Sequence, residues 1–299
     1  MSTVFTQVLG LFIFVSIGYA LGKLRICDLS HTKVLSKLLV YVFLPCNVFK
    51  TLSGNFTVSY IAGNYDLVIT GAVLLLCLLA FAYFMAKLFA KPKYERHIYE
   101  YAFVIPNFGY MGYALALDLF GVSGQVNFMT FAIAFSLYNY TVAIALLTKK
   151  SLKIKSLFHP VLVAMVLGIA AGMTGICLPD VLATAVDKSA ACMAPISMIL
   201  TGLVTAEKPL KNLLTDKRVY PMLLLRMIVM PLAIGGILTL FCNATVVRTA
   251  VLFCALPIGL NTVVYPKMVD ENCEIGTGLA LTSTALACLT LPVILQIFA

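Results

Sequence analysis

Long apolar runs constrain this chain more than any other feature. Each run is about 20 residues long, the length that a helix needs to cross a hydrocarbon core of about 30 Å. The runs lie at residues 4–23, 33–52, 66–89, 98–119, 126–148, 158–176, 184–205, 219–241, 249–268 and 276–298. The sequence therefore predicts an all-α membrane protein with ten transmembrane helices.

The amino-acid content agrees with membrane lipid as the surroundings of these helices. The chain is 62% hydrophobic and 11% charged, whereas soluble proteins are about 25% charged. Its net charge of +9 comes from basic residues in short loops between the apolar runs, which is typical of membrane orientation and not of a nucleic-acid-binding surface. The first run lacks a preceding basic segment and a following cleavage pattern, so we expect a retained span and not a signal peptide.

The distribution of lysine and arginine predicts the orientation of the spans. The first, third, fifth and seventh loops each contain three or four such residues, whereas the second, fourth and sixth contain none. Loops rich in lysine and arginine usually face the cytoplasm. We therefore expect odd-numbered loops in the cytoplasm and both termini on the extracellular or periplasmic side.

A basic segment divides the ten runs into two sets of five. Because five is odd, the second set must enter the membrane with the opposite polarity, which is the inverted-repeat arrangement of many transporters. We expect a first repeat at residues 1–148, a cytoplasmic linker at 149–157 and a second, inverted repeat at 158–299. Weak similarity supports the division, because Pro45 and Pro195 occupy similar places in the second and seventh runs, where we expect each to break its helix.

Helix-breaking residues lie near the middle of the fourth and ninth runs. They are Pro106, Gly109 and Gly112 in the fourth run, and Pro257, Gly259 and Pro266 in the ninth. Proline removes a backbone donor and glycine adds backbone freedom, so neither run should form an uninterrupted helix. Interrupted spans at matching places in two halves of a chain point to a transporter's binding site. We expect both helices to be broken at this site, near the middle of the membrane.

The broken helices also predict the chemistry of the ligand. A helix N-terminus carries a partial positive charge and free N–H groups, which suit a carboxylate. Asn107 and Asn261 add amide donors without the cost of a buried charge. The predicted ligand is therefore a small organic anion. Further candidates for lining the site are Tyr138, Asn139, Ser283 and Thr284, for which hydrogen bonding within or between helices is the alternative.

The sequence leaves the coupling ion open. No carboxylate lies at the centre of a span, so a proton relay has little support. A sodium ion near Asn261 and Thr282 is favoured slightly over a proton, and movement down a gradient without a coupling ion also fits. No other cofactor is expected. Arg226 is the deepest cation, and it either attracts an anion or extends its charged end to the interface.

Three segments resemble the auxin efflux carrier family, whose bacterial members carry malonate, malate and other organic acids. They are residues 107–115, 256–266 and 283–292, and the resemblance extends over essentially the whole chain. It implies broken helices that cross in spans 4 and 9, with the substrate at the crossing. It also implies a scaffold domain from spans 1, 2, 6 and 7, a transport domain from spans 3–5 and 8–10, and a homodimer through the scaffold. Asn107 and Asn261 match the asparagines at the family's helix crossing. The family commonly has proline where this chain has Ala114.

The predicted function is secondary transport across the plasma or bacterial inner membrane. The cargo would be a small organic anion, such as the mono- or dicarboxylates malate and malonate, moved by alternating access. Two alternatives remain open, a membrane anion sensor or scaffold without transport, and a sodium-coupled carrier of larger amphipathic anions. The sequence contains no GxSxG or HExxH motif, so an enzyme is not predicted.

Overall fold

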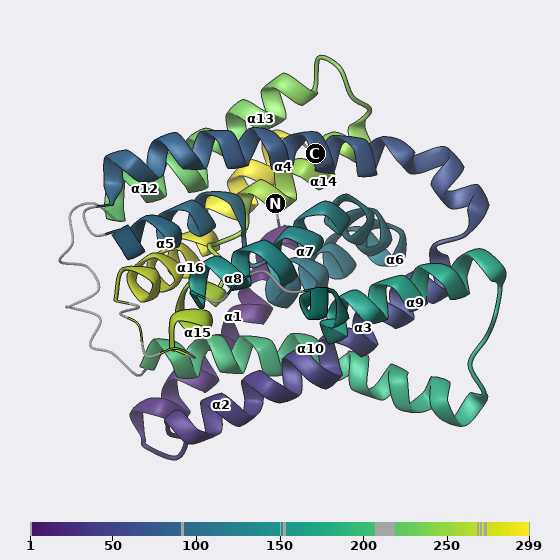
Figure 1. The fold of residues 1–299 in the computed structure, drawn as a ribbon, viewed down its shortest axis with the longest axis horizontal. Coiled ribbons are helices and arrows are strands. Elements are labelled where there is room, and N and C mark those ends of the chain that lie inside the picture. The colour runs from purple at the N-terminus through teal and green to yellow at the C-terminus, as the bar shows by residue number, and fades with distance from the viewer. Residues whose placement is uncertain are drawn as a thin grey trace.

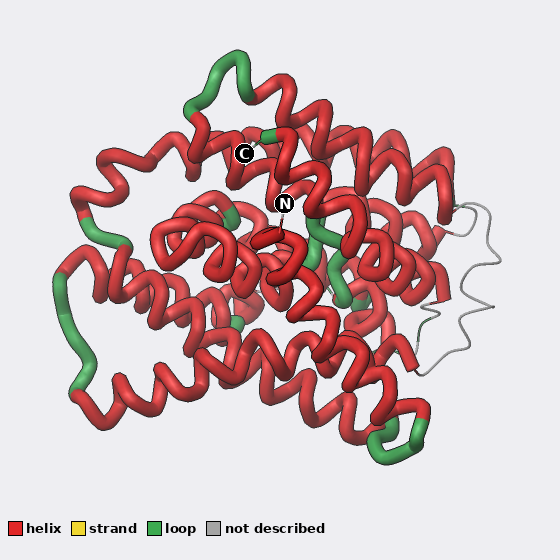
Figure 2. The backbone as a smooth tube through the Cα atoms, turned by 180° about the vertical axis from the view of Figure 1, so that it is seen from behind, coloured by secondary structure: helices red, strands yellow, loops and turns green. Residues whose placement is uncertain are grey.

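The computed structural model confirms the all-helical class (Figures 1 and 2). It describes residues 2–90, 93–149, 151, 154–206, 219–267, 269, 271 and 274–298. Within these residues the only β pairing is one isolated bridge, and every regular element is a helix. This composition is expected inside lipid, because a helix satisfies its backbone donors and acceptors within one segment.

The first half of the chain begins with long helices and then becomes irregular. The elements are α1 (Ser2–Lys23), α2 (Leu29–Leu38), η1 (Leu39–Phe43), α3 (Leu44–Asn55), α4 (Val58–Phe89), α5 (Lys93–Val104), η2 (Phe108–Gly112), α6 (Tyr113–Phe131), α7 (Ile133–Tyr138), η3 (Asn139–Ala143) and α8 (Ile144–Leu147). The segments η1, η2 and η3 are π-helical. Within α6, Gly121 has a φ of +69°, so helical geometry is interrupted in the loop predicted between the fourth and fifth runs.

The second half follows a similar order. Its elements are the 3₁₀ segment η4 (Ile154–Phe158), α9 (Pro160–Thr174), α10 (Asp180–Ala206), α12 (Val219–Leu224), the π-helical η5 (Leu225–Val229), α13 (Met230–Leu238), α14 (Ala244–Ala255), α15 (Asn261–Lys267) and α16 (Glu274–Ile297). Local chemistry sets several boundaries. Asn243 caps α14 by accepting from the N–H of Val246, and α9 ends at Gly175 with a φ of +71°, as capping rules predict.

Five helices of the described chain are long and apolar enough to cross a membrane. They are Ser30–Asn55, Val58–Phe89, Asp180–Ala206, Val219–Leu238 and Glu274–Ile297. A sixth span forms if Phe108–Phe131 and Ile133–Leu147, which meet at 53°, count as one. Three further apolar segments of the described residues are shorter, Leu9–Lys23, Pro160–Thr174 and Ala244–Ala255. The count of ten spans and the outward position of the termini therefore stay predictions.

The helices form two groups (Figure 1). In one, α1 packs on α10 and α3 packs on α9, along the lower part of the view. In the other, α4 packs on α5 and α13 packs on α14, which also contacts α16. Gly18 and Gly202 let α1 and α10 approach closely, because a Cβ atom at either position would collide with the backbone of the facing helix. Small residues at such contacts are typical of membrane helices.

Two of the predicted helix breaks are absent. Pro45 is the second residue of α3, which follows η1 directly within one continuous helix from Ser30 to Asn55. Pro195 lies inside the continuous helix α10. A proline removes one hydrogen bond of its helix, and the π-helical register before Pro45 already changes the local bonding pattern. Neighbouring helices can compensate for such a loss without a break.

Candidate functional site

The chain is non-helical between α5 and η2 and between α14 and α15, and the two breaks pair with each other. Asn107 donates its backbone N–H to the carbonyl oxygen of Pro257 over 2.7 Å, and Gly259 donates to that of Ile105 over 3.2 Å. The pairing forms an isolated antiparallel bridge. The two breaks predicted in the fourth and ninth runs are therefore present, and they meet inside the protein.

A side chain from a third element supports the second break. The backbone N–H of Ile258 donates to Ser283 Oγ over 3.0 Å, while Ser283 Oγ donates to the carbonyl of Ala280 at 3.0 Å. Ser283 lies on α16 and is fully buried. It therefore satisfies a backbone group of the break instead of lining the site.

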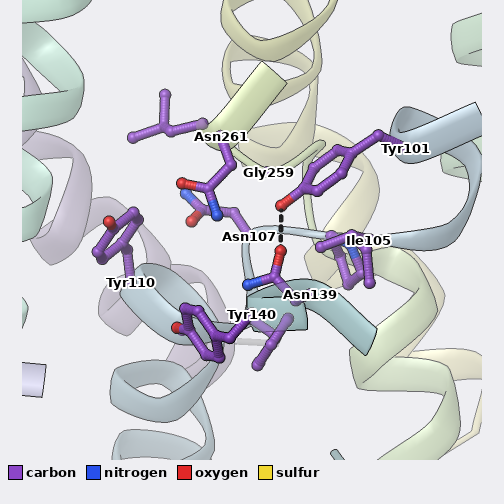
Figure 3. Close-up of a pocket in the computed structure, with 12 residues that line it drawn as sticks. Tyr101, Ile105, Asn107, Tyr110, Asn139, Tyr140, Gly259 and Asn261 are labelled. Atoms are coloured by element: carbon purple, nitrogen blue, oxygen red, sulfur yellow. Dashed lines mark hydrogen bonds between the residues drawn. The ribbon is translucent and has the colours of Figure 1, made fainter. Parts of the chain in front are cut away.

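A small pocket lies at the paired breaks (Figure 3). It contains about 250 Å³ of empty space, including the part open to solvent. The residues that line it are Tyr101, Ile105, Pro106, Asn107, Phe108, Gly109, Tyr110, Asn139, Tyr140, Gly259, Leu260 and Asn261. None of them is charged. The pocket is therefore polar and neutral, with three asparagines from three separate elements.

Asn107 carries an unpaired hydrogen-bond donor in this pocket. The residue is 3% exposed, and its Nδ2 atom has no hydrogen-bond partner among the residues that the structure describes. Asn107 precedes η2 at the N-cap position but forms no side-chain cap bond. An unsatisfied buried donor costs about 1–3 kcal/mol, so it is rare without a function. The amide of Asn107 is thus available to a ligand.

Tyrosines form part of the pocket that the sequence interpretation missed. Tyr101 donates its hydroxyl to Asn139 Oδ1 over 2.8 Å, which orients the amide of Asn139 (Figure 3). Tyr140 lines the pocket and stacks on His159 with ring centroids 4.2 Å apart. The available signal was position, because Tyr101 lies one turn before the first break and Tyr140 follows Asn139 directly.

The predicted site residues divide into two sets. Asn107, Gly109, Asn139, Gly259 and Asn261 line the pocket together with Pro106. The residues Gly112, Tyr138, Ser283 and Thr284 do not line it. The hydroxyl of Thr284 donates to the carbonyl of Ala280 within its own helix over 2.7 Å. Thr284 thus forms the hydrogen bond within a helix that was the alternative to lining the site.

Gly112 has a packing role beside the pocket. A Cβ atom at this position would lie 2.7 Å from Leu256 Cδ1 and 2.8 Å from Phe128 Cζ, so only glycine fits without rearrangement. Ala114 continues the helix as the second residue of α6. The helix is therefore interrupted at Pro106 and not at the position where the family commonly has proline. Pro266 lies in the last turn of α15.

A cluster of phenylalanine rings packs directly behind the first break. Phe253, in the last turn of α14, is fully buried. Its ring centroid lies 5.7, 5.8, 5.4 and 4.2 Å from those of Phe108, Phe128, Phe131 and Phe135. Because Phe108 follows Asn107, the cluster connects the pocket to α6, α7 and α14 through close packing.

The arrangement does not identify a cation site. Within the described residues there is no group of three or more histidine, cysteine, aspartate or glutamate side chains that could hold a metal ion. Asn261 lines the pocket and Thr282 does not. Sodium binding near these two residues remains a prediction.

Helices long enough to cross a membrane, with two broken segments that meet at a buried polar pocket, define a multi-pass membrane transport protein. Comparison with protein families supports this class, because a family model described as membrane transport protein matches residues 3–153 and 139–295. The chain belongs to this family, that of the auxin efflux carriers, which confirms the resemblance seen in the sequence. A comparison with curated proteins finds no match.

Proposed function

We propose that this protein is a secondary transporter of small organic anions, such as the carboxylates malate and malonate. The anion binds in the pocket at the paired breaks and crosses by alternating access. The observation that carries the proposal is the buried, unpaired Nδ2 donor of Asn107 in a pocket without charged side chains. A carboxylate oxygen would complete this donor's hydrogen bonding, and a hydrogen bond to a charged acceptor is stronger than one to a neutral acceptor.

The size of the pocket favours small anions over larger amphipathic ones. Its empty space is about 250 Å³ even with the part open to solvent included, and Tyr101, Tyr110 and Tyr140 are among the residues that line it. Sodium coupling, proton coupling and uncoupled movement all remain compatible with a neutral pocket, and a sodium gradient in the transport assay distinguishes the first from the others.

Helix packing supports two repeats of five spans. If spans 1–5 correspond to spans 6–10, the contact of α1 with α10 corresponds to that of α9 with α3, and the contact of α4 with α5 corresponds to that of α13 with α14. All four contacts are present. In this proposal α1, α3, α9 and α10 form the scaffold, which also forms the homodimer contact, and the second group of helices rocks against it.

Flux in proteoliposomes tests the proposal. Purified protein is reconstituted, and uptake of labelled malonate and malate is measured with and without a sodium gradient. Asn107→Ala removes one hydrogen bond to a charged group, worth about 1.5–3 kcal/mol, so the apparent affinity should fall roughly 10- to 150-fold. The matched control is Asn55→Ala, because Asn55 bonds the carbonyl of Thr51 outside the pocket.

Three results would contradict the proposal in different ways. Saturable binding of the anions without flux would favour a sensor. Normal flux in Asn107→Ala would reject the pocket as the binding site. Absence of both binding and flux for every carboxylate in the wild-type protein would reject the substrate class.

A further inference from the structure

Arg226 is a fully buried cation beside the two breaks. It lies in the π-helical segment η5, and its side chain is 1% exposed. Of the two alternatives given for Arg226, extension of its charged end to the membrane interface is therefore wrong. π-Helical segments are rare in proteins overall, and those that occur often lie at functional sites. A guanidinium held inside the protein needs hydrogen-bond acceptors that offset the free-energy cost of its desolvation.

The guanidinium joins the last turns of both half-helices. Arg226 Nε donates to the carbonyl oxygen of Ala102 in α5 over 3.3 Å, and Nη1 donates to that of Cys254 in α14. The C-terminal end of a helix carries a partial negative charge. One cation therefore lies against the negative ends of the two helices that are broken at the pocket.

The two carbonyls that Arg226 contacts have lost their helical donors. In an α-helix the carbonyl of Ala102 would accept from residue 106, which is proline and has no N–H. The carbonyl of Cys254 would accept from Ile258, whose N–H donates to Ser283 Oγ instead. Arg226 thus supplies the donors that both breaks lack.

No carboxylate neutralises this cation in the described part of the chain. The ion pairs found there do not include Arg226. Glu100, on the same helix as Ala102, pairs with Arg96 over 2.9 Å and with His97 over 3.1 Å. The corresponding span of the first repeat has no charged residue between positions 67 and 86. The paired breaks therefore have one buried cation beside them.

We propose that Arg226 is a positioning residue for anion transport, which holds the two breaks in their paired geometry and makes the pocket favour anions of higher charge. The proposal rests on the anion-transport function proposed above. Its guanidinium acts through the half-helix ends, since Arg226 does not line the pocket. The asparagines donate the hydrogen bonds to the anion, and the buried charge strengthens the binding free energy in proportion to the anion's charge.

The test compares malonate, a dianion at neutral pH, with its monoamide, a monoanion of similar size. KM and maximal rate are measured for both in proteoliposomes containing wild type, Arg226→Met or Arg226→Lys. Methionine keeps the volume and removes the charge. For a separation of about 10 Å and an effective dielectric constant of about 20, Coulomb's law gives a change in affinity on the order of tenfold per anion charge. In Arg226→Met the preference for malonate over the monoamide should therefore fall on the order of tenfold.

Arg226→Lys separates charge from geometry. Lysine keeps the charge but cannot reproduce the planar fork that reaches two carbonyls. We expect the preference for malonate to be retained and the maximal rate to fall. Arg248→Met is the matched control, because Arg248 is an exposed arginine on α14. The preference of this variant for malonate over the monoamide should equal that of the wild type.

The outcomes are distinguishable. If Arg226→Met lowers the rate for both anions but leaves the malonate preference unchanged, the role of the charge is rejected. If Arg226→Met does not fold, loss of the preference in Arg226→Lys overturns the proposal and retention supports it. If the wild-type protein transports neither anion, the proposed function fails first, whatever the variants do.

Discussion

Phe253 is the residue whose truncation should disturb the candidate site most without touching the pocket. It does not line the pocket, yet its ring is fully buried among four other phenylalanine rings. One of these is Phe108, which follows Asn107 and begins η2. Phe253→Ala would therefore leave a cavity that contacts the first residue of the helix next to the pocket.

The cost of this substitution follows from the lost contacts. Burying Phe253 involves four aromatic pairs, and at about 0.5 kcal/mol each these contribute about 2 kcal/mol beyond area burial. The total for Phe→Ala at a closely packed site is about 3–5 kcal/mol. At roughly 2 °C per kcal/mol for a chain of this size, we expect the melting temperature to fall by roughly 6–10 °C.

Thermal unfolding in detergent measures this effect, with malonate affinity as the second readout. Phe241→Ala is the control, because Phe241 is 81% exposed and exposed positions usually change stability by less than about 0.5 kcal/mol. We expect weaker malonate binding in Phe253→Ala, since η2 loses its packing. A melting temperature within about 1 °C of the control would refute the packing argument. Lower stability with unchanged affinity would refute only the connection to the pocket.

Two further predictions concern contacts of α10. Ser197 donates to the carbonyl of Tyr110 in η2 over 3.0 Å. Ser197→Ala removes this link between the two helix groups, and such a hydrogen bond is worth about 0.6 kcal/mol in a membrane protein. The turnover rate should therefore rise by up to about threefold while KM stays unchanged. A large loss of flux would contradict this prediction. Gly202→Leu should lower the melting temperature, because the Cβ atom of the new side chain would collide with the backbone of α1. Gly236→Leu is the control and should change the melting temperature little, because a Cβ atom at Gly236 would meet open space.

The sequence was most informative where structure depends on local backbone chemistry. Pro106 and Pro257 cannot donate to their helices, so both breaks could be located before any coordinates were known. The asparagines near these prolines could be identified as candidate site residues in the same way. Pro45 and Pro195 show the limit of this reasoning, because a proline removes a hydrogen bond but the surrounding helices decide whether the helix breaks.

Other parts of the site depend on packing between distant segments. Ser283 is polar and close to the second break, yet only the structure shows that its hydroxyl accepts from Ile258. Tyr101 and Asn139 are 38 positions apart and meet only after folding. Arg226 was recognised as a deep cation, but no sequence pattern shows that its acceptors are two carbonyls left without helical donors. Contacts of this kind have no local signature.

The two breaks depend on each other, and this explains how irregular backbone can persist inside an apolar protein. A single broken helix would leave backbone groups that lipid cannot satisfy, each at a cost of several kcal/mol. Here the N–H of Asn107 is satisfied by the second break and that of Gly259 by the first. Arg226 then serves one carbonyl from each. Because each break supplies partners for the other, they act as one polar unit. Nδ2 of Asn107 has no partner within this unit, and it is the donor that we propose binds the transported anion.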